Sequence, residues 1–348
     1  MTWLDHWHMR KWGPLTLSII AAALLLLVFP EADSAQVVVP TPEHPPMASK
    51  QFETDKEILY AAFSANKRGP SPDQQNRAYR AAKEFVRKYG GDGDDYAKEA
   101  RRFVTDFEKQ IKAYEVYSAY TAKNYVKAFE LGRTLLKTNS DDFFVLGILV
   151  EAGYDNAVAG NVSLNDETIG YLRKAMQLLE TGKLSKADPF KNADAASGFL
   201  NLALGWFLKD QSPVEAAAAF GKAVQPKSPY ARDPLIYYRL GVAILKGEFA
   251  QLSTEYNEKF GAKRGSPEQQ EMFDRITRAG ERAIDAFARS IALSDPKNSV
   301  EDAKSSQLTP EFRAKVLEQL TALYKALHNN SDTGLSEVIA GVLSKPPP

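Results

Sequence analysis

The sequence contains no cysteine and very little histidine. Without cysteine the chain can form no disulfide, no thiol nucleophile and no cysteine-ligated zinc site. Only four histidines occur in 348 residues, and three of them precede residue 45. Imidazole chemistry is therefore excluded from most of the chain. The fourth, His328, lies at the expected end of a helix, where a cation interacts favourably with the helix dipole, so we expect it to cap that helix.

A net charge is also absent, because 44 Lys and Arg residues balance 44 Asp and Glu residues. Proteins that bind nucleic acids usually carry a basic excess, so this balance argues against that class. The sequence has no glycine-rich phosphate loop, no G-x-S-x-G or H-E-x-x-H motif, and no carboxylate pair framed by loop glycines. It therefore predicts a protein that is not an enzyme and that binds no cofactor, metal or nucleic acid.

One short stretch, residues 90–95, resembles a calcium loop in composition, since it reads Gly-Gly-Asp-Gly-Asp-Asp. An EF-hand loop needs oxygen ligands at alternate positions, glycine at the sixth and glutamate at the twelfth. Tyr96 breaks this alternation. We therefore expect a helix end, a turn and a new helix N-cap at Asp94.

A long hydrophobic run occurs once, over residues 15–29, and Arg10 and Lys11 precede it. A basic start followed by an apolar stretch and small residues is typical of an export signal. Residues 1–34 are therefore predicted to be a signal peptide, cleaved after Ser34.

The alternative is an uncleaved membrane anchor. Residues 12–29 would form about 27 Å of helix at ~1.5 Å per residue, close to the ~30 Å hydrocarbon core of a bilayer. In both interpretations the basic residues stay in the cytoplasm and the chain after residue 34 is exported. We expect a periplasmic protein of a bacterial cell envelope, or one anchored in the inner membrane by its N-terminal helix.

Residues 35–50 are predicted to be a linker, because their prolines favour an extended polyproline II chain over a helix. The linker prolines are Pro40, Pro42, Pro45 and Pro46. Beyond it, a capping residue directly followed by proline predicts a helix start. Such pairs are Ser71-Pro72, Ser212-Pro213, Asp233-Pro234, Ser266-Pro267 and Thr309-Pro310. Predicted helix ends are Gly90-Gly91, Gly182, Gly247, Gly261 and Asn329-Asn330.

Between these signals the apolar residues recur with helical spacing. Phe103, Phe107 and Ile111 lie four residues apart, and strand-like alternation is nearly absent. The sequence therefore predicts an all-α fold. We expect N-terminal helices over residues 51–109 and closing helices over residues 301–345.

The segment between them, residues 110–300, shows a repeat. Gly205 and Gly241 lie 36 residues apart, and each follows a leucine. A small residue at such a position lets two helices approach closely while large neighbours fill the sides. The helices that follow carry a matching small–large–small spacing, with Ala216, Phe220 and Ala223 in one and Ala283, Phe287 and Ser290 in the other.

Through these residues the chain resembles the tetratricopeptide-repeat family, whose unit is a 34-residue helix–turn–helix. The best match is AIDAFARSIALSDP, residues 283–296. The resemblance implies an α-solenoid of antiparallel helix pairs over residues 110–300. Two departures occur: Gly132 stands where the family has a large residue, and residues 249–272 look like an insertion within the last unit.

The resemblance also implies a partner-binding groove lined by the first helices of successive units. Its residues would be Tyr117, Tyr120, Phe199, Leu202, Trp206, Tyr238 and Val242. We therefore expect a non-enzymatic scaffold that holds protein partners in a membrane or envelope complex. Two alternatives remain open: a murein-cleaving enzyme similar to lytic transglycosylases, and a carrier of an apolar ligand.

Overall fold

The computed structural model describes residues 54–182, 184, 187–260, 265–298 and 308–348. The predicted signal or anchor and the proline-rich linker lie outside these residues. The described chain is helical and contains no strand, so the predicted all-α class is confirmed for it. None of the described helices is both long and apolar enough to span a bilayer. The chain divides into two compact units between Ser118 and Ala119.

The first unit consists of α2 (Asp55–Asn66), α3 (Pro72–Tyr89) and most of α4 (Asp95–Thr121). Helices α2 and α3 pack together around Phe63 and Phe85, and α4 joins them through aromatic stacking. Asp94 accepts a hydrogen bond from the backbone amide of Ala97 at 2.8 Å, so the predicted turn and N-cap are confirmed. Lys56 pairs with Asp94 and with Asp92, which places the acidic stretch in a salt-bridged turn.

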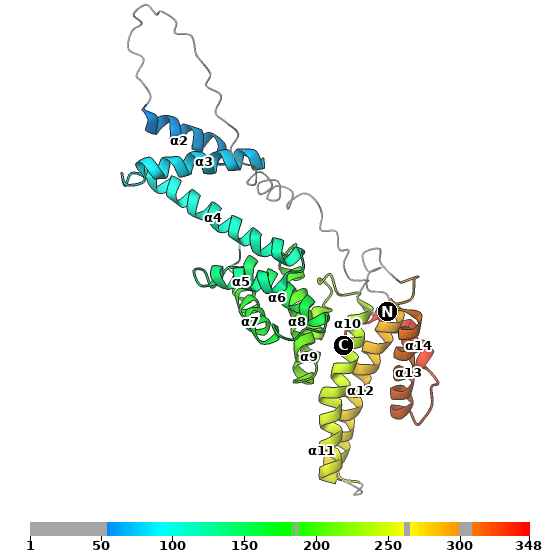
Figure 1. Ribbon diagram of the computed structural model, residues 1–348. Helices are drawn as coiled ribbons and strands as arrows, with labels where there is room; N and C mark the ends of the chain where they lie inside the picture. The colour runs from blue at the N-terminus through cyan, green and yellow to red at the C-terminus, as the bar shows by residue number, and fades with distance from the viewer. Residues whose placement is uncertain (1–53, 183, 185–186, 261–264, 299–307) are drawn as a thin grey trace, which may run out of the picture. The chain divides into compact units, whose positions relative to one another are not determined.

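The second unit is a succession of helix pairs. It begins with α5 (Tyr125–Leu136), α6 (Phe143–Val158), α7 (Asn165–Glu180), α8 (Ala193–Leu208) and α9 (Pro213–Ala223). It continues with α10 (Pro234–Ile244), the π-helical segment η2 (Leu245–Phe249), α11 (Ala250–Phe260) and α12 (Pro267–Leu293). It ends with α13 (Pro310–Leu327), α14 (Leu335–Gly341) and the 3₁₀ turn η4 (Val342–Ser344). Helices α6 and α7, α8 and α9, and α10 and α12 pack as pairs, consistent with an α-solenoid (Figure 1).

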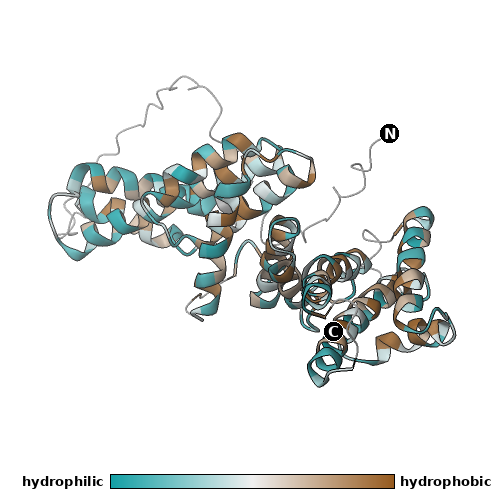
Figure 2. Ribbon diagram, turned by 90° about the horizontal axis from the view of Figure 1, so that it is seen from below, coloured by the Kyte–Doolittle hydropathy of each residue, from teal (hydrophilic) through white to brown (hydrophobic). Residues whose placement is uncertain are grey.

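The helices begin where proline follows a capping residue. Helices α3, α9, α10, α12 and α13 each start at such a proline, so all five predicted starts are confirmed. Ser71, Ser266 and Thr309 accept a hydrogen bond from the third amide of their helix, which satisfies one donor of the first turn. Ser212 makes no such bond. Most helices carry both hydrophilic and hydrophobic segments, as expected of helices with one buried face (Figure 2).

The helix pairs cross at the predicted glycines. A Cβ atom on Gly205 would lie 2.7 Å from the ring of Phe220, and one on Gly241 would lie 2.7 Å from the ring of Phe287. Each glycine therefore accommodates the phenylalanine of its pairing helix. Gly132 makes a similar approach to Leu149 of α6, so the large residue missing from α5 is supplied by its neighbour.

One predicted helix end is wrong. Helices α10 and α11 continue into each other through η2, and Gly247 lies inside this continuous stretch (Figure 1). A Cβ atom there would come within 2.8 Å of the backbone nitrogen of Val214, so the glycine serves a close approach of α9 rather than a helix end. Within the predicted insertion, residues 249–272, the described helical residues belong to the end of η2, to α11 and to the start of α12, and α11 packs against α12.

The closing helices α13 and α14 pack on α12. Val316, Leu320 and Tyr324 join the main hydrophobic core of the second unit. His328 follows α13 directly, where its Nδ1 lies 2.9 Å from the carbonyl oxygen of Tyr324 and its ring stacks on the tyrosine. The capping role expected for His328 is confirmed.

Candidate functional site

The first helices of the three pairs, α6, α8 and α10, form what we call the first-helix row. Long side chains link each member to the next. Tyr154 of α6 lies edge-on to Trp206 of α8, with ring centres 6.1 Å apart. The guanidinium of Arg239 on α10 lies over the ring of Trp206 at 4.6 Å. Tyr238 of α10 then contacts Phe312 of α13, with ring centres 4.8 Å apart.

The structure divides the predicted groove residues into two groups. Leu202 is 1% exposed and Phe199 9% exposed, so both belong to the hydrophobic core and offer a partner almost no surface. The prediction that these two residues line a binding groove is therefore wrong, because α8 packs against α9 and α7 and buries them in the core between the helices. Trp206, Tyr238 and Val242 are half-buried and lie in the first-helix row.

The two predicted tyrosines of α4 lie in different units. Tyr117 belongs to the first unit and Tyr120 to the second, and both are half-buried. The hydroxyl of Tyr120 donates a hydrogen bond to a carboxylate oxygen of Asp155 at 3.3 Å. Within the second unit, Tyr120 thus extends the row of contacts to α6.

The basic side chains of the row gather around Trp206, on its middle helix α8. Its ring lies beneath the Lys209 ammonium at 4.2 Å as well as beneath Arg239. Arg239 also donates a hydrogen bond to the hydroxyl of Tyr154 at 3.2 Å. No carboxylate of the described residues forms an ion pair with Arg239, whereas Lys209 pairs with Asp210 at 3.2 Å. Cation–π contacts of this kind contribute about 0.5–2 kcal/mol each.

The acidic end of the row lies on α6. Glu151 and Asp155 are one helical turn apart and half-buried. Burial raises the pKa of the Glu151 carboxyl to about 8, and the negative charge of Asp155 adds to the rise. Burial also raises the pKa of the Tyr120 hydroxyl, helped by the charges of Glu151 and Asp155. At neutral pH, Glu151 therefore holds its proton for much of the time.

The sequence analysis missed Glu151, Tyr154 and Arg239. Glu151 is the only charged residue among the first eleven of α6, which are otherwise apolar. A single carboxylate in such a run could have indicated a buried acid. Arg239 adjoins Tyr238, but its place over Trp206 depends on how α8 and α10 pack on α9, which residue spacing does not specify.

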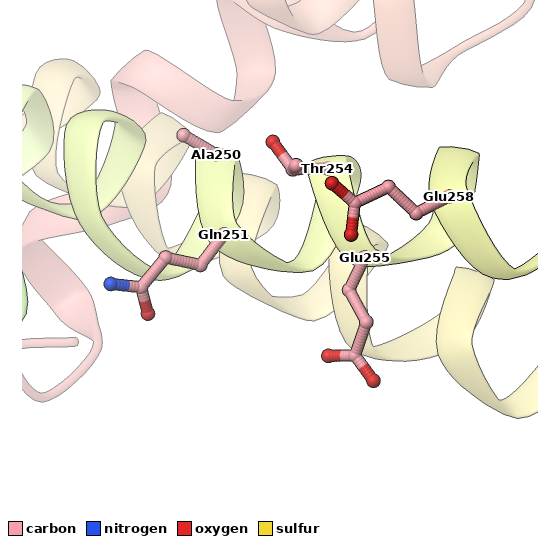
Figure 3. A pocket seen from close by; sticks show the side chains of 5 residues that line it. All are labelled: Ala250, Gln251, Thr254, Glu255 and Glu258. Carbon is pink, nitrogen blue, oxygen red and sulfur yellow. The ribbon is translucent and has the colours of Figure 1, made fainter.

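Two other features carry less chemistry. A hollow along α11 is lined by Ala250, Gln251, Thr254, Glu255 and Glu258, all from that single helix (Figure 3). No second element contributes a lining side chain, so the hollow cannot enclose a ligand. Among the residues that the structure describes, no three His, Asp or Glu side chains are grouped so that they could hold a metal ion.

Comparison of the chain with protein-family models, with curated proteins and with solved structures finds no match. The resemblance to tetratricopeptide repeats therefore stays a prediction from the residue spacing.

Proposed function

We propose that the protein is a non-enzymatic scaffold that binds another protein through the first-helix row. The observation that supports this most is the linked set of Tyr154, Trp206 and Arg239, which spans three helices and stays half-open to solvent at Trp206 and Arg239. Tryptophan, tyrosine and arginine are the residues that most often dominate the free energy of protein–protein binding.

The arrangement of the row suits binding because its side chains are already ordered. Trp206 is confined by Tyr154 on one side and by two cations over its ring. Ordering a flexible side chain on binding costs about 0.5–1.5 kcal/mol, and this cost is smaller where packing has fixed the side chain beforehand. The tetratricopeptide-like pairing supports the same function, since helical repeats present their first helices to partners.

We place this scaffold on the exported side of a bacterial membrane, in a periplasmic or envelope complex. The support for this location is the sequence of residues 1–34, which combines Arg10 and Lys11 with a long apolar run. Partner proteins are then expected among the components of membrane or envelope assemblies.

Site-directed photo-crosslinking in the source cells tests the proposal. A benzoylphenylalanine in place of Trp206 should give a discrete crosslinked species, because it lies in the first-helix row. The same group in place of Arg173, an exposed residue on the second helix α7, is the matched control. With benzoylphenylalanine in place of Val242 instead, which also lies in the first-helix row, Trp206→Ala and Tyr238→Ala should each weaken capture of the same species. Equal crosslinking from the Trp206 and Arg173 positions would contradict the proposal.

A murein-cleaving enzyme is the second candidate, and Glu151 is the observation that favours it. A general acid must hold a proton near neutral pH, and burial raises the pKa of Glu151 to about 8. Release of dye from stained murein by the purified protein tests this activity. We expect no release above that of Glu151→Gln; release that Glu151→Gln abolishes would favour the enzyme instead.

A further inference from the structure

Arg239 is an ordered guanidinium without an anionic partner. It stacks over Trp206 at 4.6 Å and donates one hydrogen bond, to the hydroxyl of Tyr154 at 3.2 Å. A guanidinium has five N–H donors, so this single bond leaves most of them available. Other arginines of the described chain, such as Arg133 and Arg289, pair with carboxylates. Arg239 has no ion pair with any described residue, although the fold holds it in place.

The lysines nearest to Arg239 already have a carboxylate partner, whereas the Arg239 guanidinium has none among the described residues. Lys209 shares the ring of Trp206, and Asp210 is the acid that pairs with it. The same carboxylate also serves Lys246 at 3.5 Å. The two lysines therefore share one carboxylate, and Arg239 is the cation of this group that has no ion pair with a described residue. The charges of Asp155 and Asp233 also act on the Tyr154 hydroxyl that Arg239 contacts, so the group is not surrounded by positive charge alone. The acidic pair of α6 forms no ion pair with Arg239.

We infer that Arg239 binds an aspartate or glutamate side chain of the protein partner, with Trp206 receiving the apolar residue beside it. Three properties point to this ligand. The guanidinium is planar and held in place, and its remaining N–H donors can bind both oxygens of one carboxylate. The Trp206 ring beside it offers an apolar surface to the neighbouring residue. An acidic side chain would also give Arg239 the ion pair that it lacks among the described residues. The inference rests on the proposed function, because it names the chemistry of the partner that the first-helix row would bind.

Selection from a phage-displayed random peptide library tests the inference without a known partner. The purified exported chain, residues 35–348, would be panned in parallel with Arg239→Glu, Trp206→Ala and the control Arg173→Glu. We expect peptides selected by the wild-type chain to share one Asp or Glu next to an apolar residue. Their affinity should fall roughly 10- to 100-fold with Arg239→Glu, the usual range for a lost charge-assisted hydrogen bond. It should stay unchanged with Arg173→Glu.

Exchange of charge provides the decisive comparison. Peptides in which the shared acid is replaced by lysine should bind Arg239→Glu better than they bind the wild-type chain. Circular dichroism of each variant checks that it is folded. The inference is wrong, while the proposed function stands, if the selected peptides lose affinity with Trp206→Ala but contain no shared acid. The same conclusion follows if their affinity is unchanged by Arg239→Glu. If no selected peptide responds to Trp206→Ala, the proposed function itself fails, and the inference with it.

Discussion

Replacing Glu151 by glutamine should remove a pH-dependent penalty on the folded state. Burial raises the pKa of this carboxyl to about 8, from an ordinary value of 4.5. Between these two values the folded protein holds more protons than the unfolded chain. Its free energy of unfolding must therefore decrease as the pH rises through this range. Glutamine cannot ionise, so Glu151→Gln should lose this part of the pH dependence.

The size of the effect follows from the same values. A rise from 4.5 to about 8, at about 1.4 kcal/mol per pKa unit, sets an upper limit of about 5 kcal/mol. The carboxylate is half-buried rather than enclosed, and water that reaches it reduces the penalty. We therefore expect Glu151→Gln to be more stable than the wild-type chain by about 1–3 kcal/mol at pH 8.5, and nearly equal to it at pH 4.5.

Urea unfolding followed by far-ultraviolet circular dichroism at both pH values measures this difference. At a slope of about 2–3 kcal/mol per molar urea, the midpoint of Glu151→Gln should lie roughly 0.5–1 M above that of the wild-type chain at pH 8.5. Glu255→Gln, which changes an exposed carboxylate on α11, is the matched control and should follow the wild type throughout. A shift of equal size at both pH values would show that Glu151 is hydrated in the folded state and would refute the reasoning.

Three further outcomes are expected. Gly241→Ala should lower the free energy of unfolding by about 1–3 kcal/mol, measured by urea unfolding, because its Cβ would meet the ring of Phe287 at 2.7 Å. A Cβ atom on Gly221, in α9, would meet no atom within 4 Å, so Gly221→Ala should instead raise the free energy of unfolding by about 0.5–1 kcal/mol. If Gly221→Ala and Gly241→Ala both lowered it, the close crossing at Gly241 would be contradicted. Mass spectrometry of the protein isolated from the cell envelope should find the chain beginning after Ser34, whereas an intact residue 1 would indicate the membrane anchor.

Much of the helical framework could be predicted from local sequence. Proline after a capping residue fixes a helix start through backbone geometry alone, and all five such starts are confirmed. The close helix crossings at Gly205 and Gly241 could also be predicted, because the sequence spaces small and large residues regularly in both helices of a pair. The structure shows Phe220 and Phe287 against these glycines. Gly247 was misread as a helix end, since glycine at a close approach and glycine at a helix end look alike in sequence.

The candidate site was less predictable. The neighbouring helices decide which side chains on one face of a helix are buried and which stay at the surface. The repeat spacing does not show where those neighbours lie. Leu202 and Trp206 are four residues apart on α8, yet one is buried and the other is half-open. Arg239 acquires its role only when α9, which packs on both α8 and α10, brings these helices close enough for the guanidinium to reach Trp206. Pairings between neighbouring helices therefore had to come from the structure.

The hairpin of α11 and α12 shows where this fold can accept extra sequence. Beyond η2 it is a thin, two-helix arm with a small core of its own, formed by Leu252, Met272, Ile276 and Ala279. Its two helices pack against each other, so helical turns can be added to or removed from both together without disturbing the other helix pairs of the second unit. The length of the arm can therefore vary without changing the surface of the first-helix row. Because its core is small, the amide hydrogens of the arm should exchange before those of the rest of the second unit.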